Sequence, residues 1–122
     1  MRHVSSKLCT ATLLACLSAT AAFGWGAIAV DHSEEENPDE TGYALEAGYP
    51  TRAAATRAAM TACRSTGSEN CELVVVFKKC GAYAASLNYY GVGVGTTLQQ
   101  AEQRALSDCN DKDCVIVVSD CD

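Results

Sequence analysis

The sequence predicts an α+β fold in which two pseudo-symmetric ββαβ repeats share one antiparallel-rich sheet, with both helices packed on one side of it. Three observations support this prediction. One pattern of residues occurs twice along the chain, each copy holds an alanine-rich helical stretch between short strand-like segments, and six cysteines recur at related places in the copies. The chain of 122 residues is long enough for one small domain with one core.

The first residues, 1–24, have the pattern of a secretory signal peptide. Arg2 and Lys7 precede a run of small apolar residues from 8 to 22, which is too short to span a bilayer. Small residues offer cleavage sites after Ala21, Ala22 or Gly24. We therefore expect export to the periplasm or out of the cell, with residues 25–122 as a single mature domain that inserts in no membrane.

A lipoprotein signal remains an alternative, because Leu13-Leu-Ala-Cys16 loosely resembles the box before a lipidated cysteine.

Removal of the signal lowers the net charge from −6 to −8, since Arg2 and Lys7 leave with it. A surface this acidic repels nucleic acid and anionic lipid. We therefore expect neither as a partner.

The internal repeat is visible in the order of its parts. Gly26-Ala-Ile-Ala-Val reappears as Gly81-Ala-Tyr-Ala-Ala, and the stretch from Thr51 to Cys63 matches that from Thr97 to Cys109. A valine-rich run and a closing cysteine follow in each copy. The expected repeats are residues 25–80 and 81–121.

Each repeat is expected to form two strands, a helix and a third strand. The helices follow from apolar residues at i, i+4, i+5 and i+8, and from Thr51 and Thr97 as N-caps, the latter forming a capping box with Gln100. The valine runs are too short for helices and favour strands. The expected strands are 25–30, 43–47, 73–77, 82–87, 89–94 and 115–118, and the expected helices are 52–63 and 98–109. Each helix presents alanine to the core, with Met60 and Leu106 as the larger side chains.

The segment Gly91-Val-Gly-Val-Gly is expected to be a strand with one bare face, which a backbone or an aromatic ring can approach closely. It lacks the spacing of a phosphate-binding loop, so no nucleotide site is predicted.

We expect Trp25 and Tyr83 in the core by their strand positions. Of the adjacent Tyr89 and Tyr90, strand alternation places one outside.

The mature cysteines are expected to form structural disulfides. Matching local spacings favour Cys63–Cys71 and Cys109–Cys114, which leaves Cys80 and Cys121 to pair across the two repeats. A zinc site would need Cys-x-x-Cys pairs, and a cysteine nucleophile would need a histidine base, yet His32 is the only mature histidine. No metal, cofactor or catalytic set is predicted.

An acidic segment interrupts the first repeat. Its carboxylates repel one another, so it is expected to be an exposed loop that could meet a basic partner; weak, non-specific cation binding is the alternative. Its acidic residues are Asp31, Glu34, Glu35, Glu36, Asp39 and Glu40.

The ordered motifs resemble the domain-of-unknown-function 4189 family. They are Trp25-Gly-Ala-Ile-Ala-Val, Cys80-Gly-Ala-Tyr-Ala, Gly91-Val-Gly-Val-Gly before an alanine-rich helix, and the closing Cys114-Val-Ile-Val-Val. The resemblance covers the whole mature chain and implies a small exported bacterial protein of one domain, with no catalytic residues to transfer. This chain departs from the family pattern in the glycine segment, where it has Val92 and Val94 at positions at which aromatic residues are expected.

The leading functional hypothesis is a non-enzymatic exported module that binds another protein, as an inhibitor, an immunity protein or an effector. Aromatic side chains on strands can form a recognition surface. The candidates are Tyr43, Tyr49, Tyr89 and Tyr90. Two other classes stay open, namely a cofactor-free hydrolase with paired carboxylates and an envelope stress or structural protein.

Overall fold

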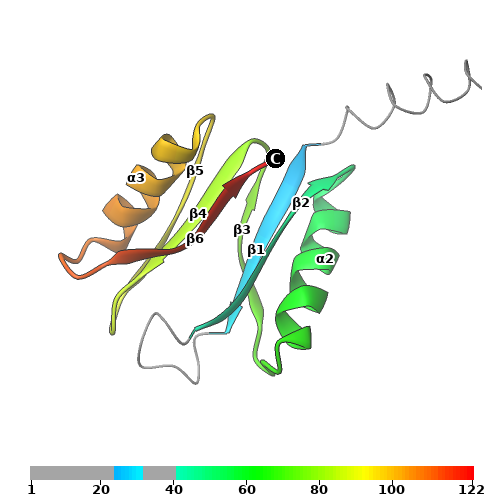
Figure 1. Ribbon diagram of the computed structural model, residues 1–122, viewed down its shortest axis with the longest axis horizontal. Helices are drawn as coiled ribbons and strands as arrows, with labels where there is room; N and C mark the ends of the chain where they lie inside the picture. The colour runs from blue at the N-terminus through cyan, green and yellow to red at the C-terminus, as the bar shows by residue number, and fades with distance from the viewer. Residues whose placement is uncertain (1–23, 32–40) are drawn as a thin grey trace, which may run out of the picture.

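The computed structural model describes residues 24–31 and 41–122, and it shows six strands and two helices there (Figure 1). The predicted signal segment and most of the acidic loop lie outside the described residues. The elements are β1 (Trp25–Asp31), β2 (Gly42–Tyr49), α2 (Arg52–Ser65), β3 (Glu72–Phe77), β4 (Cys80–Ala85), β5 (Tyr90–Gly95), α3 (Leu98–Cys109) and β6 (Val115–Cys121).

The predicted α+β class and the predicted ββαβ order of both repeats are confirmed, but the shared sheet is not. The strands form two antiparallel sheets, with orders β2-β1-β3 and β5-β4-β6. The helices lie on opposite sides of the molecule, α2 against the first sheet and α3 against the second (Figure 1). The domain is therefore a four-layer sandwich of helix, sheet, sheet and helix.

The alternation of side chains along the central strands explains the four layers. In β1, Ala27 and Ala29 pack under α2, while Ile28 and Val30 join a second cluster that contains Tyr83 of β4. β1 is thus covered on both faces, by its helix and by the other sheet. A single sheet with both helices on one side would leave the face with the larger side chains, Ile28 and Val30, exposed to water.

Phe77, at the end of β3, fills the space between the two sheets and is almost fully buried. A Cβ atom added at Gly26 or at Gly81 would collide with its ring. The two glycines occupy equivalent places in the repeats, so one aromatic ring uses the gap that both leave.

The three predicted disulfide pairings are confirmed as Cys63–Cys71, Cys109–Cys114 and Cys80–Cys121. The expectation that the last bond crosses the two repeats is wrong. Cys80 opens β4 and is the cross-strand partner of Cys121 on β6. The bond therefore lies within the second sheet, and the second repeat begins at Cys80.

Several boundaries differ from the sequence prediction. The opening strand of the second repeat ends at Ala85 rather than Leu87, because the Ser86 N–H donates to the carbonyl of Tyr89 and closes a turn. Tyr89 therefore lies in that turn, and both Tyr89 and Tyr90 are exposed.

Leu106, expected in the core, is 38% exposed, since α3 buries only Ala101, Ala105 and Cys109.

Both predicted N-caps are confirmed. The Thr51 hydroxyl accepts the N–H of Ala54, and the Thr97 hydroxyl accepts the N–H of Gln100. The Gln100 side chain reaches back one residue further than a capping box requires, to the N–H of Thr96.

Among the described residues Tyr83 is the largest fully buried side chain, and its pKa is raised to about 12, first by burial and then by Tyr90 and Glu72. Between about pH 10 and 12 the unfolded chain releases this proton while the native state keeps it. Stability should therefore be complete below that window and fall as the pH rises through it. We expect Tyr83→Phe to flatten the fall, measured as urea midpoints at increasing pH. An equally steep fall in the variant would contradict this assignment.

Candidate functional site

The two repeats differ most where each helix passes its neighbouring edge strand. The strand registers make Ala44, Glu46 and Tyr49 of β2 equivalent to Gly91, Gly93 and Gly95 of β5. These are the positions that face the helices. The first repeat thus carries side chains where the second has none.

In the second repeat the glycines allow α3 to lie directly on β5. A Cβ at Gly93 would collide with the Ala101 carbonyl oxygen and the Ala105 nitrogen, which belong to the helix backbone. The predicted strand with one bare face is therefore confirmed, and the group that approaches it is a helix backbone. Two α3 side chains also bond to β5, since Asp108 accepts the N–H of Val92 at 2.9 Å and Arg104 donates to the Val94 carbonyl at 2.7 Å.

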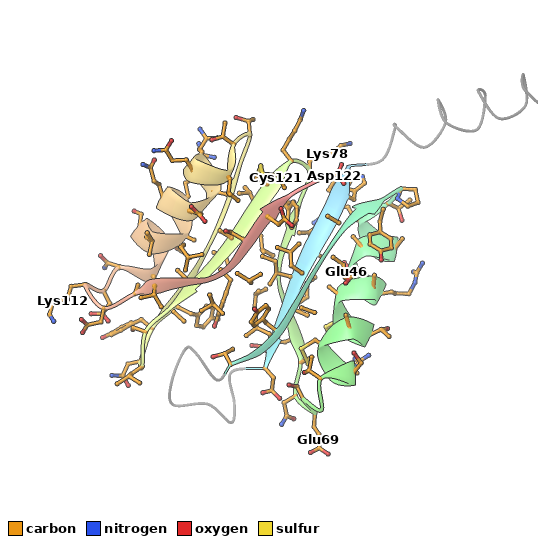
Figure 2. The ribbon with its side chains drawn as sticks, in the orientation of Figure 1. Glu46, Glu69, Lys78, Lys112, Cys121 and Asp122 are labelled. Carbon is orange, nitrogen blue, oxygen red and sulfur yellow. A yellow bond between two sulfur atoms is a disulfide. The ribbon has the colours of Figure 1, made fainter. Side chains whose placement is uncertain are left out.

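In the first repeat the corresponding place is an open groove of about 560 Å³ between β2 and α2. Alanines take the positions of the two bonding side chains, Ala58 for Arg104 and Ala62 for Asp108. Figure 2 shows Glu46 between β2 and α2. The residues that line this α2–β2 groove are Glu46, Tyr49, Arg57, Ala58, Thr61, Ala62 and Ser65.

The groove has a fixed polar end. The Tyr49 hydroxyl donates to Glu46 Oε1 at 2.9 Å, and this bond is the main cause of a raised pKa at Tyr49, with burial second. The bond holds the carboxylate against its own strand. On the opposite wall α2 contributes Arg57, and the helix also carries Arg52 and Arg64 outside the groove and no acidic residue. The groove therefore has one tethered carboxylate facing a basic helix.

This arrangement is suited to binding. Small methyl groups make the helix wall, and hydroxyl, carboxylate and guanidinium groups surround it. Glu46 is the only carboxylate among the lining residues, so this groove does not supply the carboxylate pair that a hydrolase of that class needs.

At the end of the molecule beside β1, Trp25 lies under two cations. The Lys78 ammonium is 4.8 Å and the Arg52 guanidinium 5.6 Å from the ring centre. Trp25, expected in the core, is only partly buried there. These contacts hold the first turn of α2 against the start of β1.

The structure places the four candidate tyrosines in separate parts of the fold. Tyr49 lines the groove, and Tyr43 lies near the other end of β2. Tyr90 of β5 pairs with Ala85 of β4 and contacts Tyr83 at 5.8 Å between ring centres, with Tyr89 beside it in the turn. Only Tyr49 is thus part of the groove.

Of the acidic segment, Asp31 alone lies within the described residues. It ends β1, is 2% exposed and accepts the N–H of Asn70 at 3.0 Å, so it is a buried structural acceptor and not part of an exposed loop. The other acidic residues of that segment, Glu34, Glu35, Glu36, Asp39 and Glu40, lie outside the described residues.

Within residues 24–31 and 41–122, no three side chains of the metal-binding types gather into a cluster. No helix in the same ranges has the length and apolar character needed to cross a membrane.

Four of the groove residues are not predicted from the sequence, namely Glu46, Arg57, Ala58 and Ala62. For the two alanines the signal is the mismatch between the repeats: Ala58 stands where the second repeat has Arg104, and Ala62 stands where it has Asp108.

Three curated proteins share part of this sequence. Protein Mb1300c of Mycobacterium bovis and proteins MT1307 and Rv1269c of Mycobacterium tuberculosis are each 46% identical to the chain over 59 residues. The match covers 48% of this chain and 45% of each relative, so the chain spans about half the length of the curated relatives it matches. No solved structure matches the chain.

A family profile extends over nearly the whole described fold. The profile described as domain of unknown function (DUF4189) matches residues 25–121, from the first residue of β1 to the last of β6. Both repeats, both helices and all three disulfides lie inside this match. The chain belongs to the DUF4189 family.

Proposed function

We propose that this domain is an exported protein-binding module and that the α2–β2 groove is its binding surface. One observation carries the proposal. The same strand–helix junction occurs twice, closed by glycines and two bonding side chains in the second repeat and open in the first. Because the fold closes this junction between strand and helix in one repeat, the open junction in the other repeat leaves space that a ligand can occupy.

The chemistry of the groove supports a protein ligand. Tyrosine and arginine are enriched at the energetic centres of protein interfaces, and Tyr49 and Arg57 both line this groove. The Glu46 bond orients Tyr49 before any ligand arrives, which reduces the entropy lost on binding.

Export is supported by the predicted signal segment and by the disulfides. Three disulfides join all six cysteines of the region 25–122. Such bonds persist in oxidising compartments such as the periplasm and the extracellular medium. A partner would accordingly be another exported or surface protein.

Site-specific crosslinking tests the proposal. A photoreactive amino acid is placed at Thr61, on the groove wall, and in a second variant at the equivalent Ser107 of α3, which is also exposed to solvent. Both variants are expressed in the native bacterium. We expect a crosslinked protein with Thr61 that is absent with Ser107. No crosslink at Thr61, or the same crosslinks from both positions, would contradict the proposed function.

A further inference from the structure

We propose that the ligand of the α2–β2 groove is an extended segment of a partner protein, which adds as a fourth strand to the outer edge of β2 and places an acidic side chain against Arg57. This inference rests on the proposed function and specifies the kind of ligand. Recognition of this type takes affinity from main-chain hydrogen bonds and specificity from side-chain pockets.

The second repeat shows which backbone groups of the edge strand point outward. Alternate residues of an antiparallel edge strand direct their N–H and C=O groups away from the sheet. In β5 the Val92 N–H and the Val94 carbonyl bond to Asp108 and Arg104 of α3, so these residues form the outer row. The helix thereby blocks the edge of β5 with side chains of its own.

The first repeat has the same outer row without this protection. Leu45 pairs with Ile28 as Val92 pairs with Tyr83, so the N–H and C=O of Leu45 point outward from β2. The nearby α2 residues are Ala58 and Ala62, whose methyl groups form no hydrogen bonds. In the part of the chain that the structure describes, no α2 side chain bonds to this edge. An added strand offers the missing donors and acceptors together.

The register limits where such a strand can pair. β2 runs in regular register from Gly42 to Glu46, and then an irregularity shifts the pairing with β1 before Tyr49. The regular part is therefore the template for the added strand. The groove lies beside Glu46, where this regular part of β2 ends. It can receive those side chains of the added strand that point toward α2.

The charge of the groove indicates which kind of side chain the added strand places there. Arg57 stands at the groove on a helix with three arginines and no acidic residue, whereas the Glu46 carboxylate already accepts the Tyr49 hydroxyl. A carboxylate on the added strand can form a charge-assisted pair with the Arg57 guanidinium. We therefore expect Asp or Glu at the ligand position that faces α2.

The first test transfers the blocking residues of α3 to α2. The probe is a phage-displayed library of short random peptides, selected on the wild-type protein. Peptides should be obtained that are enriched in Asp or Glu and that bind the Ala58→Arg/Ala62→Asp double variant about tenfold or more weakly. The matched control, Gln99→Arg/Gln103→Asp, places the same charges four residues apart on the exposed face of α3 and should leave affinity unchanged.

The second test examines the backbone and needs no variant that might fail to fold. Single N-methyl groups along a selected peptide should reduce affinity at every second position, because only alternate N–H groups of a strand face β2. In the complex, amide exchange at Leu45 should slow by about tenfold or more, and exchange at Val92 should not change.

Each contrary result has a distinct meaning. Failure to obtain peptides, equal binding by the Ala58→Arg/Ala62→Asp variant, or affinity unaffected by N-methylation would overturn strand addition. Enrichment of Lys or Arg in place of acidic residues would overturn the role of Arg57. A Thr61-specific crosslink obtained alongside any of these results would leave the proposed function standing, whereas loss of that crosslink would remove the proposed function itself.

Discussion

Gly93→Val should destabilise the folded domain by at least about 3 kcal/mol, near the upper end of the cost of overpacking a core. The added atoms would meet the backbone of α3 at Ala101 and Ala105, and a helix backbone cannot move aside as a flexible side chain can. A loss of this size lowers the midpoint of thermal unfolding by on the order of 15 °C for a domain of this length. Circular dichroism during heating measures it.

The matched control is Glu46→Val, the same side chain at the equivalent position of β2. Because a side chain already occupies this position, the groove accepts valine, and we expect a change within about 1 kcal/mol, since the site is partly exposed. Equal effects of the two substitutions would show that the repeats do not differ in the way described.

The Cys80→Ala/Cys121→Ala double variant should lose about 4 kcal/mol of stability, from the chain entropy of a loop closed over 41 residues. The local bonds close loops of only 8 and 5 residues and should contribute about 2.5 and 2 kcal/mol. Small domains have about 5–15 kcal/mol in total. The loss of the Cys80 bond should therefore leave a marginally stable protein.

Urea unfolding of three double alanine variants, one for each bond, measures these differences. We expect the order of destabilisation to follow loop length, with Cys109–Cys114 the smallest. If the Cys80–Cys121 pair proved the least costly to remove, the stabilisation by that bond would not come from the unfolded state.

Much of the fold follows from local patterns in the sequence. The helices are predicted by apolar periodicity and by the Thr51 and Thr97 caps, and the disulfide pairs by matched spacing, because these are short-range features. The number of sheets depends on long-range packing. The faces of β1 and β4 are apolar on both sides, and that pattern alone does not distinguish one sheet covered by helices from two sheets facing each other.

The candidate site was harder to predict for a related reason. A search for chemically active side chains selects tyrosines and carboxylates, whereas this groove is defined by what is small, namely Ala58 and Ala62 where α3 has Arg104 and Asp108. Tyr49 was found because it is aromatic. The role of the alanines depends on the strand registers that make β2 equivalent to β5, and these registers are a property of the folded chain.

Residue-resolved amide hydrogen exchange on the protein alone tests the central claim, that the β2 edge is open and the β5 edge is blocked. We expect fast exchange at the Leu45 N–H and slow exchange at the Val92 N–H, which donates to the Asp108 carboxylate. In Asp108→Ala the Val92 amide should become as fast as that of Leu45. Slow exchange at Leu45 in the unliganded protein would mean that the β2 edge is already paired, and it would contradict both the open edge and the ligand proposed for it.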